Sequence, residues 1–226
     1  MSEVSRDEVT PAPLVFLIPC RLRGERLEAC INSIAATVNI PFHIVVGFDD
    51  DATSFNQLRK RPYVTKFLYT PRHYFVRTMN RLFEDARALF PKMTYFVVCN
   101  DDDFFSLFDW GVKAIATHQE VYPDNNGVIE LFWSGRIHCY ISHVATFADN
   151  PWIYNPVFTQ YYADHELWQM LVASDRYTAL DEKNVLNRIV SHNVMSTLDA
   201  LASETFQAWH ESDAATFLHL HPTEKA

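Results

Sequence analysis

Three consecutive aspartates, Asp101, Asp102 and Asp103, follow the apolar run YFVVC that begins at Tyr95. A short apolar run that ends in acids is typical of a central strand in a parallel sheet. Open α/β sheets bind their ligands at the carboxyl ends of the strands, so these carboxylates stand where chemistry is expected. Three adjacent carboxylates repel one another, and a divalent cation, basic residues or water at a solvated turn must compensate them. Oxygen ligands of this kind suit Mg²⁺ or Mn²⁺ with substrate phosphates, and the competing interpretation is an acidic surface turn.

Two further groups of polar residues follow other apolar runs. Asp49, Asp50 and Asp51 come after FHIVVGF, and an arginine-containing loop with Arg21 and Arg23 comes after LVFLIP. Because parallel strands end at the same edge of a sheet, we expect these groups to lie near Asp101–Asp103. Acids and arginines at one edge could serve a nucleotide, whose base and ribose need polar contacts and whose diphosphate needs positive charge.

The first half of the chain alternates apolar runs with amphipathic stretches. The runs predict strands at 14–18, 42–48, 66–69 and from 95 onward, and the periodicity predicts helices at 27–38, near 54 and at 74–90. This β-α order predicts an α/β fold with a mostly parallel sheet and helices on both faces. The second half is less regular: we expect a helix at 107–121, strands at 128–133 and 137–144 (the latter antiparallel), an aromatic loop at 149–163, a helix from 164, a strand at 184–191 and a last helix at 196–209.

Length and composition indicate one globular domain. The chain has 226 residues, of which 48% are hydrophobic and 21% charged, and we expect a leader (1–13), one domain (14–210) and a tail (211–226). The net charge of −9 argues against a general nucleic-acid coat, but residues 59–92 hold nine Lys or Arg and two acids, which is 9 − 2 = +7. Such a basic segment fits phosphate-bearing ligands.

Several classes of protein are disfavoured by what the sequence lacks. The four cysteines (Cys20, Cys30, Cys99, Cys139) have no metal-type spacing, so we expect buried free thiols in a reducing compartment. The polar N-terminus predicts no signal peptide, and we expect a cytoplasmic protein, with a phage gene product in its host as one case. The sequence has no GxGxxG, GxxxxGK or GxSxG motif, which disfavours the usual dinucleotide fold, P-loop enzymes and α/β-hydrolases.

In combination, these pieces resemble the GT-A (Rossmann-like) glycosyltransferases of the family-two type, which use nucleotide-diphosphate sugars. The resemblance rests on LVFLIPCR, IVVGFDD, the Arg-x-x-Asn pair Arg77 and Asn80, and VVCNDDD, in this order. It covers residues 14–110 well and continues more weakly to about 210. In size and in its C-terminal helix the chain also resembles compact phage-type members. The resemblance implies a single-domain enzyme that transfers a hexose from a donor such as a UDP-sugar.

The resemblance also implies roles for particular residues. Asp101 and Asp103, with Asp102 between them, would bind Mn²⁺ or Mg²⁺ and the donor diphosphate, as the family's Asp-x-Asp motif does. The other donor-binding positions would be Pro19, Arg21, Asp49, Asp50, Arg77 and Asn80. Asp51 stands where the family often has glycine, which is a departure from its pattern.

The family's catalytic base is an acid at the start of a helix after an acceptor loop. YYADHELW places Asp164 on that position, with Ala163 in place of the family's first acid and Glu166 as the next candidate. The competing interpretation is that Asp164 is only a helix N-cap. A histidine supplies a further metal ligand in many relatives; His192 in RIVSHN fits best, and His219 and His221 are rivals.

Three functions remain open from the sequence. The first is an inverting glycosyltransferase, whose acceptor could be a hydroxymethylated base in DNA or a glycan of the cell surface. The second is a nucleotide-sugar or glycan-binding protein without turnover, because a fold does not determine a function. The third is a nucleotidyltransferase, which would need a more glycine-rich loop than PCRLRGER. We expect no obligate protein partner and no transmembrane segment.

Overall fold

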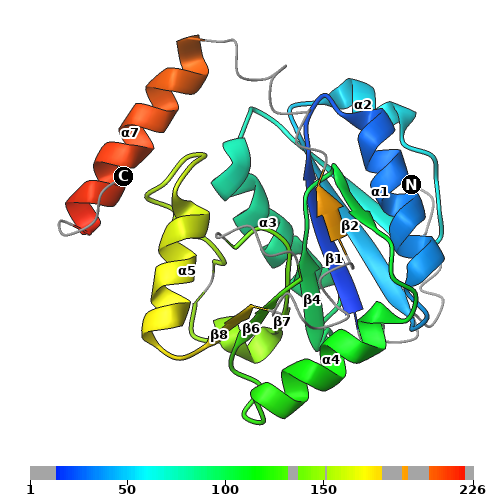
Figure 1. The fold of residues 1–226 in the computed structure, drawn as a ribbon. Helices are drawn as coiled ribbons and strands as arrows, with labels where there is room; N and C mark the ends of the chain where they lie inside the picture. Colours follow the sequence, from blue (N-terminus) through cyan, green and yellow to red (C-terminus); the bar gives the residue numbers. More distant parts are fainter. Residues whose placement is uncertain (1–13, 132–136, 151, 180–189, 193–203, 222–226) are drawn as a thin grey trace.

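The computed structural model describes residues 14–131, 137–150, 152–179, 190–192 and 204–221 (Figure 1). In chain order the elements are β1 (Leu14–Cys20), α1 (Gly24–Thr37), β2 (Phe42–Asp49), α2 (Ala52–Gln57), β3 (Val64–Tyr69), α3 (Tyr74–Leu89), β4 (Tyr95–Val98), β5 (Asp103–Phe105), α4 (Trp110–Val121), β6 (Val128–Glu130), β7 (Tyr140–His143), the 3₁₀ helix η1 (Val144–Phe147), α5 (Ala163–Ala173), β8 (Tyr177–Ala179), β9 (Val190–His192) and α7 (Glu204–Leu220).

The main sheet has seven strands in the order β3-β2-β1-β4-β7-β6-β8. Strands β3, β2, β1 and β4 are parallel, whereas β7 runs antiparallel to both β4 and β6. Strand β8 pairs in parallel with β6, and β5 and β9 form a separate antiparallel pair. The predicted α/β class with a mostly parallel sheet is therefore confirmed.

Strand β1 lies in the middle of the parallel half and separates two apolar cores. Its alternate residues Leu14, Phe16 and Ile18 belong to one core, whereas Val15 and Leu17 belong to the other. This alternation is the period of two that a strand imposes, and burial on both faces explains why the sequence shows an unbroken apolar run.

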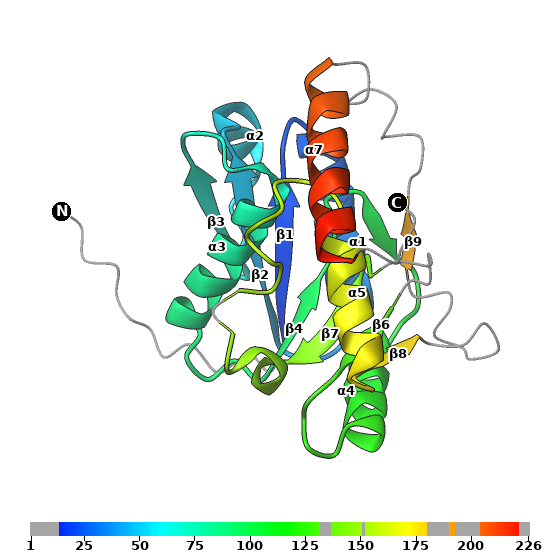
Figure 2. The same ribbon diagram turned by 90° about the vertical axis from the view of Figure 1, so that its left-hand side faces the viewer.

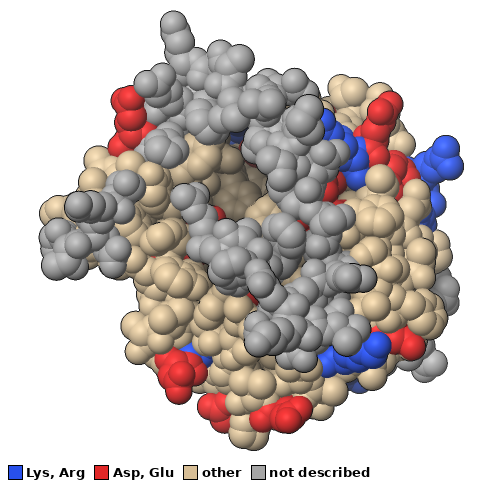
Figure 3. Space-filling model, in the orientation of Figure 1, with Lys and Arg blue, Asp and Glu red and all other residues tan. Residues whose placement is uncertain are grey.

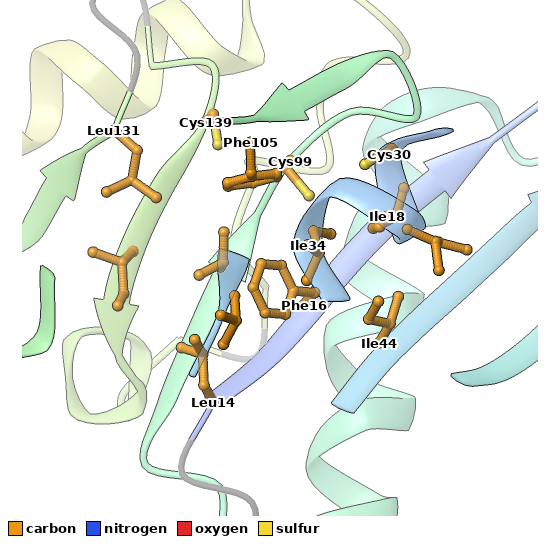
Figure 4. Packing of buried hydrophobic residues seen from close by; sticks show 14 of the residues in the cluster. Leu14, Phe16, Ile18, Cys30, Ile34, Ile44, Cys99, Phe105, Leu131 and Cys139 are labelled. Carbon is orange, nitrogen blue, oxygen red and sulfur yellow. The ribbon is translucent and has the colours of Figure 1, made fainter. Parts of the chain in front are cut away.

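Helices cover both faces of the sheet (Figures 1 and 2). The first core joins the sheet to α1 and α4 through Leu27, Ile34 and Trp110, and Figure 4 shows part of it. The second core joins the sheet to α3, α5 and α7 through Phe83, Leu167 and Phe217. All four cysteines are free and buried, as predicted. Within the described part of the chain, every helix is too short or too polar to span a membrane.

The strongly periodic elements of the first half agree with the sequence predictions, and the differences fall later. Helix α4 begins at Trp110 rather than Leu107, because Asp109 has a left-handed backbone (φ 61°) that cannot belong to a helix. The last helix continues to Leu220, through most of the segment predicted as a tail. Strands β5 and β8 were not predicted.

Some sequence predictions fall wholly or partly on residues outside the described ranges. Of the strand predicted at 128–133, Val128–Glu130 is observed, and of the one predicted at 137–144, Tyr140–His143. Strand β9 overlaps the end of the strand predicted at 184–191. Residues 131 and 137–139 are described and lie outside the strands, and Val144 begins η1. The leader, residues 132–133, 184–189 and 196–203, and residues 222–226 of the tail lie outside the described ranges.

Candidate active site

The site lies at the carboxyl edge of the parallel strands. Strand β1 runs on to Cys20, although its pairing with β4 ends at Leu17 and Val98. This explains why Pro19, which has no N–H, is tolerated in a central strand: on the β4 side its neighbour has already ended. Figure 3 shows a hollow near the middle of the face that Figure 1 presents.

Arg23 binds two of the three aspartates at this edge. One guanidinium nitrogen, Nη1, lies 3.2 Å from Oδ1 of Asp101 and 3.3 Å from Oδ2 of Asp102. The side chains of Asp101 and Asp102 are 6% and 1% exposed. Buried carboxylates this close together require a compensating charge, and Arg23 supplies it from the loop after β1.

Asp103 points to a different set of partners. Its Oδ2 accepts the backbone N–H of Asn100 at 2.7 Å, and its Oδ1 lies 3.2 Å from Nε2 of His138. Asp103 begins strand β5 and is paired with His192 of β9. Two contacts from α1 and α4 hold this region: Phe105 N–H donates to Ser33 Oγ at 3.0 Å, and Trp110 Nε1 donates to Thr37 Oγ1 at 3.2 Å.

The pKa values of two groups show how these charges interact. Burial raises the pKa of Asp101 to about 6; Arg23 opposes this shift, and the charge of Asp102 adds to it. Burial alone would lower the pKa of His138, but the hydrogen bond to Asp103 and the charges of Asp103, Asp102 and Asp164 raise it above its usual value. His138 therefore lies within electrostatic reach of both the acid cluster and Asp164.

Asp164 lies in the first turn of α5, where it is not the N-cap. Tyr162 occupies the cap position with a left-handed backbone (φ 59°) and no side-chain capping bond, and Oδ1 of Asp164 accepts the N–H of His165 at 2.9 Å. The interpretation of Asp164 as a helix N-cap is therefore wrong. The carboxylate is half-buried, and its charge acts on His138 and on Tyr154.

Glu166, the alternative base, is turned toward the loop that precedes α5. It is 7% exposed, and its Oε1 accepts a hydrogen bond from Asn155 Nδ2 at 2.8 Å. This contact fastens the aromatic loop to α5, so the structure gives Glu166 a role in holding that loop.

The three acids at the end of β2 have different surroundings. Asp49 accepts the backbone N–H groups of His73 and Tyr74 and so binds the N-terminal end of α3. Asp50 is exposed and has a left-handed backbone (φ 55°). Asp51 caps α2 through Ser54 N–H at 3.0 Å and accepts Leu22 N–H at 2.6 Å.

Asp51 therefore connects the loop after β2 to the loop after β1. Burial raises its pKa, but the hydrogen bonds from Ser54 and Leu22 and the charge of Arg21 outweigh burial and hold the pKa below its usual value. The sequence departs from the family's glycine at this position, and the structure supplies a reason for the aspartate.

Asn80 of the Arg-x-x-Asn pair holds the aromatic loop against α3. Its Oδ1 accepts the N–H groups of Ile153 at 3.0 Å and Tyr154 at 2.9 Å, and its Nδ2 donates to Tyr154 O at 2.7 Å. Arg77 is exposed on the same helix, and its charge contributes to lowering the pKa of His73, after burial. The structure thus gives Asn80 a loop-anchoring role, and the nucleotide contacts of both residues remain predictions.

Most of the basic charge in 59–92 is engaged within the protein. Arg61 pairs with Glu28, Arg72 with Asp49, and Arg81 with Glu84 and Asp85. Lys66 lies over the Phe55 ring and Arg87 over the Phe83 ring. On the face in Figure 3, Lys and Arg form small separate groups. The segment therefore does not present one continuous basic surface among the described residues on that face.

The donor atoms at the site fit a divalent cation only with help from the substrate. No group of three or more His, Cys, Asp or Glu side chains in the described ranges could hold a metal, since Asp101 and Asp103 turn to different partners. Mg²⁺ and Mn²⁺ sites often use one or two carboxylates and complete the shell with phosphates and water. His192 is placed opposite Asp103 by the strand pairing, whereas His219 lies in the last turn of α7 and His221 packs on Phe217.

Two residues of the site had no assigned role in the sequence analysis. Arg23 was noted in the loop after β1, but the donor-binding role was assigned to Arg21. His138 stands in a segment predicted only as a strand, where a lone histidine carries no motif. A search for basic residues near the ends of other strands could have suggested both, because three adjacent carboxylates require such partners.

Comparisons with known proteins bear on the fold. No protein-family model matches the chain, and no curated protein matches its sequence. Among solved structures, residues 1–349 of S. aureus TarS in complex with UDP-GlcNAc match with a TM-score of 0.59 and 14% identity over 91% of this chain and 66% of that one.

Two other structures match at a similar level. A second structure of S. aureus TarS has a TM-score of 0.58 and 12% identity over 93% of this chain and 43% of that chain. The mannosyltransferase PcManGT from Pyrobaculum calidifontis, in complex with GDP-Man and Mn²⁺, has a TM-score of 0.57 and 12% identity over 78% of this chain and 56% of that one. The chain thus spans less than two thirds of the length of these proteins. Together with the sheet order and the helices on both faces, the matches show that the chain has the GT-A-type fold that its sequence predicts.

Proposed function

We propose that this protein is a metal-dependent, inverting glycosyltransferase that moves a sugar from a nucleotide-diphosphate donor, such as a UDP-sugar, to an acceptor hydroxyl. The observation that carries the proposal is the grouping of Arg23, Asp101–Asp103, His138 and Asp164 at the carboxyl edge of a GT-A-type sheet. The bound UDP-GlcNAc of TarS and the GDP-Man with Mn²⁺ of PcManGT support a nucleotide-sugar donor.

In this mechanism Asp164 acts as the general base. Its carboxylate takes the proton of the acceptor hydroxyl while the oxygen attacks the anomeric carbon, on the face opposite the leaving group. The new carbon–oxygen bond forms as the bond from the anomeric carbon to the phosphate oxygen breaks. The electron pair of that broken bond leaves with the nucleoside diphosphate, and the configuration inverts.

Positive charge at the leaving group lowers the barrier, because negative charge develops there in the transition state. Arg23 lies at the acid cluster, and Arg21 is close enough to affect the pKa of Asp51. When bound by Asp101 and Asp103, with His192 at the paired strand position, Mg²⁺ or Mn²⁺ would supply further charge to the diphosphate. The aromatic loop that precedes α5 would exclude water that could hydrolyse the donor.

The engagement of the basic side chains in 59–92 favours a saccharide acceptor over DNA. A DNA-binding surface needs several Lys or Arg side chains available to phosphates, and five of the nine in this segment contact acids or aromatic rings of the protein. If the acceptor were DNA, the affinity of the protein for DNA would fall steeply as the salt concentration rises.

Asp164→Asn tests the proposal. Asn keeps an oxygen that can accept the His165 N–H but cannot take a proton, so we expect native melting, native donor binding and a loss of transfer of about 10²–10⁴-fold. Asp175→Asn is the matched control, since Asp175 is exposed at the other end of α5 and its left-handed backbone (φ 59°) suits asparagine.

The assay measures nucleotide released from a panel of sugar donors, in the presence of saccharide and hydroxymethylated-DNA acceptors. Donor titration by calorimetry with and without Mn²⁺ tests the metal separately. Transfer within a few-fold of wild type in Asp164→Asn would assign the base to another residue, with Glu166 next. Donor binding without any transfer in wild type would favour a nucleotide-sugar binding protein instead.

A further inference from the structure

Helix α7 contributes a buried carboxylate to the segment just before α5. Asp213 is 2% exposed, and it accepts the backbone N–H groups of three consecutive residues: Thr159 at 3.2 Å, Gln160 at 2.8 Å and Tyr161 at 2.8 Å. Successive N–H groups that converge on one anion form a concave binding site of the kind called a nest. Here the anion comes from the same chain, some fifty residues later, which ties α7 to this turn.

A second contact follows one helical turn later on α7. Phe217 is 1% exposed; its ring stacks on Tyr162 with a centroid distance of 5.4 Å and meets His165 edge-on at 4.9 Å. These two residues lie on either side of Asp164 in the sequence.

The opposite side of the same segment is held by the first turn of α3. Val76 N–H donates to Thr159 O at 3.2 Å, and Phe75 N–H donates to Gln160 Oε1 at 3.1 Å. The contacts of α7 therefore extend over residues 159–165, and α3 holds the start of this segment at Thr159 and Gln160. Tyr162 has a left-handed backbone (φ 59°), which is disfavoured for an aromatic residue and persists only where its surroundings enforce it.

We propose that α7 is a positioning element for Asp164, and that Asp213 is the positioning residue through which it acts. The carboxylate fixes the turn at 159–161, Phe217 fixes the residues that flank Asp164, and together they aim the Asp164 carboxylate at the acceptor hydroxyl. The catalytic part of this inference rests on the proposed function, whereas the control of residues 159–165 by α7 does not. A helix that only stabilised the fold would affect donor binding and transfer alike.

Asp213→Asn tests the inference in the full chain. Asn has one carbonyl oxygen in place of two carboxylate oxygens and no charge, so the three N–H groups are held less well. We expect the amides of 159–161 to exchange with deuterium at least tenfold faster, donor affinity to stay within twofold, and transfer turnover to fall by about 10–10²-fold, because a small misplacement of a catalytic group is costly. Asp213→Ala, which removes both oxygens, should raise the exchange rate and lower the turnover further.

Glu211→Gln is the matched control, since it makes the same carboxylate-to-amide change at an exposed position of the same helix. It should leave exchange and transfer unchanged. Phe217→Leu is the second variant: it preserves an apolar side chain but removes the ring contacts to Tyr162 and His165, and it remains informative if Asp213→Asn folds poorly.

The outcomes separate this inference from the proposed function. Unchanged exchange at 159–165 in both variants would overturn the inference. A parallel loss of melting temperature, donor affinity and transfer would also overturn it, since it would show a structural role only. If the wild-type protein binds donors but transfers no sugar, the proposed function fails. The deuterium exchange of the amides at 159–165 then tests by itself whether α7 controls this segment.

Discussion

Asn80→Ala should destabilise the protein without weakening donor binding. The family resemblance implies a nucleotide contact for Asn80, whereas the structure uses its side chain to hold the backbone of Ile153 and Tyr154. These two roles make opposite predictions. Loss of a nucleotide contact would weaken donor binding at constant stability, and loss of an anchor would do the reverse.

The size of the effect follows from the groups left without partners. Ile153 and Tyr154 are 2% and 1% exposed, so the alanine variant leaves two N–H groups and one carbonyl buried without their hydrogen bonds. At about 1 kcal/mol for each, the lower end of the cost of an unsatisfied buried group, the loss is about 3 kcal/mol. For a domain of this size that corresponds to a fall in Tm of about 6–12 °C.

Arg77→Ala is the matched control on the same helix, because Arg77 is exposed and is the other member of the Arg-x-x-Asn pair. The free energy of unfolding of this variant should differ from that of wild type by less than about 0.5 kcal/mol. The assay is thermal melting of each variant followed by donor calorimetry at a temperature where both are folded. A shift in Tm below 2 °C for Asn80→Ala, combined with a tenfold or larger loss of donor affinity, would refute the anchoring role.

Two further variants test the packing around the site. Asp51→Ala removes the α2 cap and the hydrogen bond from Leu22 N–H, and it should lower the free energy of unfolding by about 2–3 kcal/mol. Because the pKa of Asp51 is depressed in the folded protein, this loss should be complete above the ordinary pKa of 3.8 and should shrink as the pH falls through the folded pKa. Denaturant unfolding of both proteins measures it, and a loss that stays constant from pH 7 to pH 2 would contradict the prediction. Gly127→Ala places a Cβ 2.5 Å from the Tyr122 ring and should lower the free energy of unfolding by about 1–3 kcal/mol. Gly24→Ala is the control, since its Cβ meets no atom nearer than 3.4 Å, and it should have the Tm of wild type. An equal Tm for the two variants would show that the Tyr122 ring can move aside.

The sequence was sufficient for the parallel half of the fold because its elements are strongly patterned. Strands β1, β2 and β4 are apolar on both faces, and α3 carries a continuous buried stripe. The missed strands β5 and β8 have three residues each, too few to establish a period. The end of α7 was missed since its described buried residues include one acid, Asp213, and one aromatic, Phe217, which do not form an apolar stripe.

The sequence could suggest candidate site residues only from the ends of single strands and helices. Asp101–Asp103 and Asp164 were chosen as candidates from their positions after a strand and at a helix start, and the structure places both near His138. The contacts of Asn80, Asp51 and Asp213 could not be predicted, because each side chain binds backbone groups of a distant segment. Such bonds depend on tertiary approach and leave no local pattern.

The charge balance of the acid cluster indicates what donor binding requires. Arg23 and His138 provide at most two positive charges to three buried carboxylates, and burial raises the pKa of Asp101 to about 6 although Arg23 opposes that shift. In the proposed function, a nucleoside diphosphate would add further negative charge at the same edge of the sheet. Binding would therefore be opposed unless more positive charge arrives with the donor or the side chains rearrange, for example by Arg23 turning from the aspartates to the phosphates. In the proposed mechanism a divalent cation held by Asp101 and Asp103 would meet this need most directly, since it would supply positive charge to the carboxylates and the donor together and leave Arg23 available to the leaving group.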